Sequence, residues 1–157
     1  MFMKAEDMIQ LLRRQRHEFL NRIQVVSGYL QLGYPARAGK YLQELAADME
    51  LDRELLVGFA PEVSLLLFAH RLQGREIGIL IKFRKIDVRP DLDVEIIGPA
   101  SLRRMRNLLE DITRDDQNLS VVEASILMAE DRVVFRVYLP GEGEREFTLT
   151  GGEPDVC

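Results

Sequence analysis

His17 lies in a pattern of residue types that could carry out phosphoryl transfer. An imidazole nucleophile needs one ring nitrogen free for attack and the other held in a fixed tautomer by a nearby carboxylate or amide. Glu18 follows the histidine directly, and Asn21 lies about one helical turn further on. A lone outward histidine on a helix is most often only a surface residue, so the hypothesis of a phosphoryl acceptor depends on these two neighbours.

Further polar residues are expected on or near the same side of this helix. Arg13 and Arg14 lie one turn before the histidine, where guanidinium groups would stabilise an arriving phosphoryl group and the acidic surface that delivers it. Gln10 and Gln24 extend the polar face in both directions, and Gly28 leaves space where a partner could approach. We therefore expect these residues to contact a partner protein.

The apolar residues predict that His17 belongs to a helical hairpin. From Phe2 to about Leu32 they recur at three- and four-residue steps, centred on Phe19 and opposite the histidine. A Gly-Tyr-Pro stop at residues 33–35 precedes a second helix, expected at 38–57. Each apolar stripe is wide enough to face more than one neighbour. We therefore expect the hairpin to dimerise into a four-helix bundle.

After Pro61 the pattern changes to alternating helices and strands. Short helices are expected at 62–73 and at 100–113, the second with Ser101 as its cap after Gly98-Pro99. Alternating apolar residues predict strands at 77–84, 119–128, 133–139 and 146–150, before a frayed tail at 151–157. The fold class is therefore α+β, with a helical hairpin domain over residues 1–58 and a small α/β sandwich domain over residues 59–157.

Composition and charge restrict the function classes. The chain has 157 residues, 46% of them hydrophobic and 30% charged, which is ordinary globular composition. No apolar run approaches the roughly 20 residues of a membrane span, and the default expectation is a cytoplasmic protein. The net charge is −5, yet residues 1–40 carry seven basic and three acidic groups. A basic first segment on an acidic chain favours an acidic protein partner rather than nucleic acid or a membrane.

Residues 16–33 read RHEFLNRIQVVSGYLQLG, a run that resembles the phosphoacceptor helix of the sporulation initiation phosphotransferase B family. Sensor histidine kinases of the citrate and fumarate type share it. That family forms a dimeric four-helix bundle from two hairpins, each followed by a domain similar to the histidine-kinase ATPase domain. The resemblance implies that His17 is phosphorylated, that Glu18 assists the transfer, and that Asn21 is the amide one turn on. The family more often has aspartate in place of Glu18. Both side chains carry a carboxylate, so the difference changes the length of the side chain more than its chemistry.

The second half is only remotely similar to kinase ATPase domains, and positions that would bind ATP differ. Residues 107–109 match the Asn-Leu-Leu of the asparagine box, but Asp111 replaces the second asparagine, which helps to hold magnesium. Aspartate can still bind magnesium. Leu139 stands where an aspartate would accept the adenine amino group, and few residues follow in which an ATP lid could form. We therefore expect a degenerate ATPase-like domain without a tightly bound cofactor.

These features favour a phosphorelay histidine phosphotransferase without ATP-dependent kinase activity. His17 would accept a phosphoryl group from the aspartate of one response regulator and pass it to another, and the regulators would supply Mg²⁺. Two alternatives remain open: a truncated sensor histidine kinase, which Leu139 argues against, and a non-enzymatic module that binds a response regulator. The joint presence of His17, Glu18 and Asn21 argues against the second.

Three remaining features of the sequence are not expected to take part in chemistry. His70 lies in an apolar run and is expected to be a partly buried structural residue. Cys157 is a lone cysteine with no base nearby in the sequence, so neither disulfides nor thiol chemistry are expected. The basic run at 103–106 is expected to be a solvated helix face.

Overall fold

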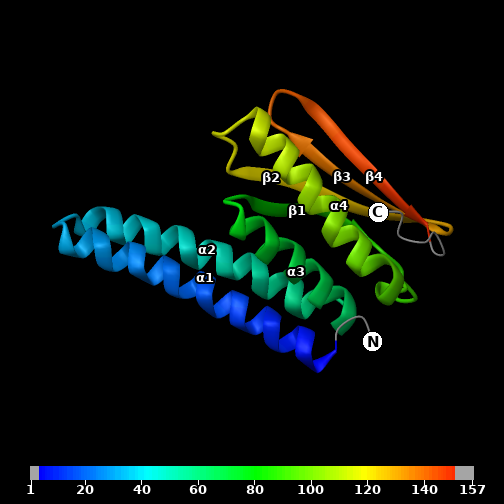
Figure 1. Cartoon of the computed structure of the whole chain (residues 1–157), viewed down its shortest axis with the longest axis horizontal. Coiled ribbons are helices and arrows are strands. Elements are labelled where there is room, and N and C mark those ends of the chain that lie inside the picture. Colours follow the sequence, from blue (N-terminus) through cyan, green and yellow to red (C-terminus); the bar gives the residue numbers. More distant parts are fainter. Residues whose placement is uncertain (1–3, 151–157) are drawn as a thin grey trace.

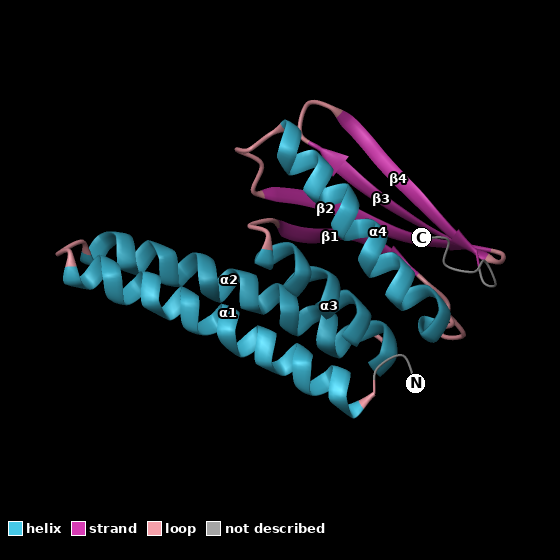
Figure 2. Cartoon of the chain, viewed as in Figure 1, coloured by secondary structure: helices cyan, strands magenta, loops and turns pink. Residues whose placement is uncertain are grey.

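The chain folds as a helical hairpin that packs beside a layer of helices and a four-stranded sheet (Figures 1 and 2). The structure, a computed structural model, describes residues 4–150. The expected tail at 151–157, with Cys157, lies outside the described residues. In chain order the elements are α1 (Ala5–Gln31), α2 (Pro35–Gly58), α3 (Pro61–Glu76), β1 (Leu80–Asp87), α4 (Val94–Asp115), β2 (Val121–Ala129), β3 (Arg132–Leu139) and β4 (Gly143–Thr150).

The sheet is mixed and has the strand order β1-β2-β3-β4. β1 runs parallel to β2, with Leu80 opposite Val121, while β2, β3 and β4 are antiparallel neighbours. A parallel pair requires a crossover connection, and α4 supplies it. α3 and α4 pack against each other, and their contacts with β1 and β4 cover one face of the sheet. An α+β fold is therefore confirmed.

The hairpin turn lies at the predicted Gly-Tyr-Pro stop, but α2 begins earlier than expected. Gly33 has a φ of +78°, which favours glycine, and it ends α1. Pro35 is then the first residue of α2 instead of part of the stop signal. Proline suits this position because its missing N–H would have no partner in the first turn of a helix.

α4 also begins earlier than predicted, and its predicted cap is wrong. Asp93 is the cap, and its side chain accepts hydrogen bonds from the backbone N–H groups of Glu95 and Ile96. The helix then continues through Pro99, while Ser101 is buried and donates its hydroxyl to the carbonyl of Gly98 at 2.8 Å. The added first turn is stabilised because its apolar side chains are buried in the core.

The first strand is shifted relative to the prediction. α3 continues to Glu76, and a turn at Gly78, with a φ of +81°, separates it from β1. A Cβ on Gly74 would lie 2.8 Å from the carbonyl oxygen of Ile79, so only glycine allows this close approach. The alternation at 77–84 therefore began in the turn, and the strand occupies Leu80–Asp87.

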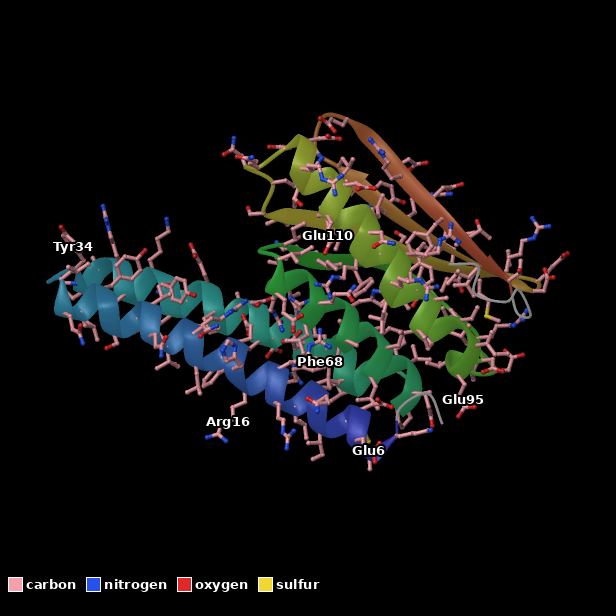
Figure 3. The ribbon with its side chains drawn as sticks, in the orientation of Figure 1. Glu6, Arg16, Tyr34, Phe68, Glu95 and Glu110 are labelled. Carbon is pink, nitrogen blue, oxygen red and sulfur yellow. The ribbon has the colours of Figure 1, made fainter. Side chains whose placement is uncertain are left out.

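The main core lies between the sheet and the helices α3 and α4. A smaller cluster joins α1 to α3, where Leu11 is buried against Phe68 and Leu72; Figure 3 shows Phe68 on the side of α3 that faces the hairpin. Apolar residues of the main core include Leu66, Leu67, Ile81, Met105, Leu109, Val122, Phe135 and Val137.

His70 is more deeply buried than the sequence indicated, with 0% of its surface exposed. Its Nε2 lies 3.0 Å from the Ser101 hydroxyl oxygen, and its ring centroid lies 5.5 Å from that of Phe135. Nδ1 has no hydrogen-bond partner within the described residues. Burial lowers the pKa of His70 from 6.5 to about 3.

We expect this buried histidine to make the protein sensitive to acid. Since the unfolded chain binds a proton at His70 near the ordinary pKa and the folded chain does not, its contribution is lost as the pH falls below 6.5. From pH 7 to pH 5, the free energy of unfolding should fall by about 2 kcal/mol more in the wild-type protein than in His70→Gln. Urea unfolding followed by circular dichroism would measure this. If the free energy of unfolding fell equally with pH in both proteins, the burial of a neutral imidazole would be contradicted.

Candidate functional site

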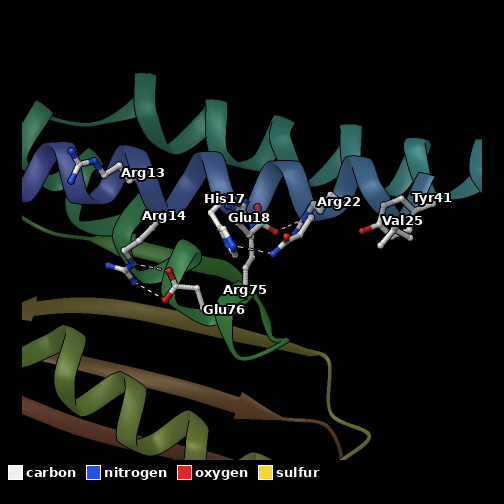
Figure 4. A pocket seen from close by; sticks show the side chains of 10 residues that line it. Arg13, Arg14, His17, Glu18, Arg22, Val25, Tyr41, Arg75 and Glu76 are labelled. Carbon is white, nitrogen blue, oxygen red and sulfur yellow. Dashed lines mark hydrogen bonds and ion pairs between the residues drawn. The ribbon is translucent and has the colours of Figure 1, made fainter. Parts of the chain in front are cut away.

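An open pocket of about 760 Å³ lies beside His17, between α1 and the end of α3 (Figure 4). α1 provides most of the lining, and α2 and α3 close it from the side. The His17 side chain is exposed at this pocket, as the helical periodicity predicts. The lining residues are Arg13, Arg14, His17, Glu18, Asn21, Arg22, Val25, Tyr41, Arg75 and Glu76.

Asn21 contacts the imidazole of His17. Its Nδ2 lies 3.4 Å from Nδ1 of His17, across one helical turn. The amide presents a donor at one end and an acceptor at the other, and rotation by half a turn exchanges them. With the oxygen toward the ring, the amide accepts the Nδ1 proton and leaves the lone pair of Nε2 free for attack. The pairing predicted for His17 and Asn21 is thus present in the geometry.

Glu18 lines the same pocket as His17, but its carboxylate is held toward the inner side of α1 by Arg22. Its carboxylate accepts a hydrogen bond from Nε of Arg22, four residues on. The Arg22 guanidinium also donates to Oδ2 of Asp48 in α2 at 2.8 Å. The structure therefore brings Glu18 to Arg22 and Asn21 to His17.

A cluster of buried charges joins α2 to α3 behind this pair. Asp48 lies between Arg71 and Arg75, with its Oδ2 2.9 Å from Nε of Arg75. Asp52 binds the same two guanidinium groups, with its Oδ1 2.5 Å from Nη1 of Arg71. Burial raises the pKa of Asp48, but hydrogen bonds and charges from Arg75, Arg71 and Arg22 outweigh it and hold that pKa below its usual value.

Arg14 connects the His17 side of α1 to the last residue of α3. Its guanidinium makes two parallel bonds to the Glu76 carboxylate, at 2.6 Å and 2.7 Å. The hydrogen bond to Glu76 raises the pKa of Arg14, so its charge is fixed. Arg13 lines the same pocket, so the two predicted arginines both lie beside the histidine.

The other predicted partner-binding residues lie along α1 outside the pocket lining. Gln10 and Gln24 are exposed, and Gly28 is half-buried with open space where a Cβ would lie. Arg22 was not predicted as a site residue, although its four-residue spacing from Glu18 is typical of a helical ion pair. Arg75 and Glu76 were not predicted either, and the sequence contains no signal for them because tertiary packing brings α3 to α1.

A family model now gives this site a context. The model described as sensor kinase SpoOB-type, alpha-helical domain matches residues 1–57, which confirms over the whole hairpin the resemblance based on residues 16–33. The N-terminal helices are thus a domain of this type, which relates the protein to sensor kinases and phosphorelay proteins of two-component signalling. A search of curated proteins gives no match. Within residues 4–150, no helix combines the length and apolar character needed to cross a bilayer.

We expect the Asp48→Ala substitution to destabilise the protein strongly, because it leaves the buried guanidinium groups of Arg71 and Arg75 with a single carboxylate, that of Asp52, to balance two positive charges. Removing one partner of a buried ion pair typically costs about 3–5 kcal/mol. Glu50→Ala on the same helix removes an exposed ion pair with Arg53 and serves as the control. Urea unfolding at one protein concentration should show a large loss only for Asp48→Ala. Similar midpoints for the two variants would contradict the buried cluster.

Proposed function

We propose that this protein is a phosphorelay histidine phosphotransferase of the cytoplasm. His17 accepts a phosphoryl group from the aspartate of one response regulator and passes it to the aspartate of another. The observation that carries the proposal is an exposed imidazole at an open pocket with an amide 3.4 Å from its Nδ1. The proposed organisation is a hairpin domain over residues 1–58 and a degenerate ATPase-like domain over residues 59–157.

The transfer requires only groups that this geometry and a receiver domain would provide. The lone pair on Nε2 of His17 attacks phosphorus in line, the N–P bond forms, and the P–O bond to the aspartate breaks. The aspartate leaves as a carboxylate, and the proton on Nδ1 remains on the ring, where the Asn21 amide accepts it when the amide is turned with its oxygen toward Nδ1. Charge on the transferring group would be neutralised by the Mg²⁺ and lysine that a receiver supplies, together with Arg13 at the pocket; the Arg14 guanidinium is bound to Glu76.

A second copy of the chain would cover the exposed apolar side of the hairpin. On α1, Leu12 and Leu30 are 55% and 56% exposed. On α2, Leu42, Met49 and Leu56 recur at seven-residue spacing and are 45–48% exposed. A heptad stripe of this kind is typical of a four-helix bundle built from two hairpins, and a large exposed apolar patch indicates a protein interface.

The environment of Leu139 favours a phosphotransferase over an ATP-dependent kinase. This residue stands where kinases need an aspartate for adenine, and its side chain is 7% exposed within the main core. Asn107 and Asp111, the remnants of the asparagine box, are exposed on α4. The proposed donor of the phosphoryl group is therefore a response regulator and not ATP.

Transfer of label tests the function directly. We expect radiolabel from a phosphorylated single-domain response regulator to reach this protein as an acid-labile, base-stable adduct, and to be absent in His17→Gln. The chain has only two histidines, and His70 is buried, so the loss assigns the acceptor. A parallel sample with labelled ATP distinguishes the alternatives. Label from ATP would indicate a kinase, and no label from either source would favour a binding module.

The bundle is tested by placing a charge in the apolar stripe. Phe19, 40% exposed in the single chain, would be buried between hairpins, so we expect Phe19→Glu to convert a dimer to a monomer. Ile96→Glu is the control, because Ile96 is 47% exposed but lies on α4. Sedimentation equilibrium at micromolar concentration gives the molecular mass. A dimeric Phe19→Glu variant or a monomeric wild-type protein would contradict the proposed interface.

A further inference from the structure

A continuous network of hydrogen bonds and ion pairs runs from strand β1 to Glu18, the residue next to His17. It begins at Arg71, whose Nε donates to the backbone carbonyl of Ile81 in β1 at 3.0 Å. Arg71 and Arg75 hold Asp48, and Asp48 accepts a hydrogen bond from Arg22. Arg22 in turn binds Glu18 (Figure 4). Three helices and a strand thus determine where the Glu18 carboxylate lies.

Burial gives this network of ion pairs a single favoured arrangement. The side chains of Arg71, Arg75 and Asp48 are 1%, 5% and 6% exposed, while Arg22 and Glu18 are 20% and 18% exposed. With Asp52, the cluster contains three carboxylates and three guanidinium groups, so its charges balance. A buried charge that loses its partner is costly, and each member is therefore held by its neighbours.

Arg22 is the member that determines what the acidic neighbour of His17 can do. An unpaired Glu18 carboxylate could turn toward the histidine and compete with the Asn21 amide for Nδ1. It would also add an uncompensated negative charge beside an incoming phosphoryl anion. Bonded to Arg22, the carboxylate is neutralised and held on the inner side of α1, which leaves Asn21 as the contact of Nδ1.

We propose that Arg22 is a positioning residue for phosphoryl transfer: anchored by Asp48, it fixes and neutralises the Glu18 carboxylate so that the Asn21 amide orients the imidazole. This inference rests on the proposed phosphotransferase function. It assigns Glu18 an indirect role, through Arg22, and it makes the reactive geometry in α1 depend on Arg75 and Arg71 in α3. The sheet domain thereby contributes to the site without touching the phosphoryl group.

Single-turnover transfer from a phosphorylated single-domain receiver tests this role, measured over a range of receiver concentrations. Small misplacements of reacting groups cost large factors in rate. We therefore expect Arg22→Gln to lower the saturating rate by about tenfold or more, with a half-saturating concentration within about twofold of wild type. Arg22→Lys keeps the charge but reaches only one carboxylate, so its saturating rate should lie between those of the wild-type protein and Arg22→Gln. Circular dichroism melting verifies the fold of each variant.

Two comparisons separate positioning from a general structural effect. Arg106→Gln removes another Arg–Glu pair with four-residue spacing, 2.9 Å long on α4, and should transfer at the wild-type rate. In a Glu18→Gln background, Arg22→Gln should cause no further loss, because Arg22 acts through Glu18.

Each other result has a definite meaning. A wild-type saturating rate in Arg22→Gln, or an equal further loss in the Glu18→Gln background, would overturn the role of Arg22 alone. If Arg22→Gln does not fold, a wild-type rate in Arg22→Lys would overturn it instead. If the wild-type protein itself takes no label from the receiver, the proposed function fails and this inference fails with it.

Discussion

The pairing of Asp48 with Arg71 and Arg75 is the constraint on which the arrangement of the helices depends. These side chains are almost fully buried where α2 meets α3, and buried charges are tolerated only when each has its partner in place. The pairing therefore fixes the hairpin against α3 at one position. It also makes the inner side of α1 polar at this level, since Arg22 and Glu18 complete the same cluster. Leu11 packs against α3, whereas the apolar side chains of Leu12 and Leu30 stay exposed.

This division gives α1 three sides with different roles. The inner side carries Leu11, Glu18 and Arg22 and packs against the rest of the chain. The apolar side, which includes Leu12, stays exposed in the single chain, and Figure 3 shows Arg16 on the outer side of the helix. The third side carries His17 and is flanked by the end of α3 through the Arg14–Glu76 pair. In the proposed function, one helix would therefore contact its own chain, a second copy and a receiver on three separate sides.

The sequence predicted what depends on local order along the chain and failed where distant segments meet. Helical periodicity placed His17 opposite Phe19, and four-residue spacing placed Asn21 beside it. The buried cluster could not be predicted in the same way, because Asp48, Arg71 and Arg75 become neighbours only after α2 and α3 pack. Pro99 shows the opposite error: a strong local stop signal was overridden by the Asp93 cap and by core burial of the added turn.

The sheet has a part in this arrangement through the backbone of its first strand. Ile81 accepts a hydrogen bond from Arg71, so β1 helps to fix the guanidinium that in turn holds Asp48. Gly74 permits the close approach of α3 to β1 that this bond requires. A domain that positions α3 in this way supports the hairpin through backbone geometry and buried charge. Such support needs an intact core, to which the buried side chain of Leu139 contributes.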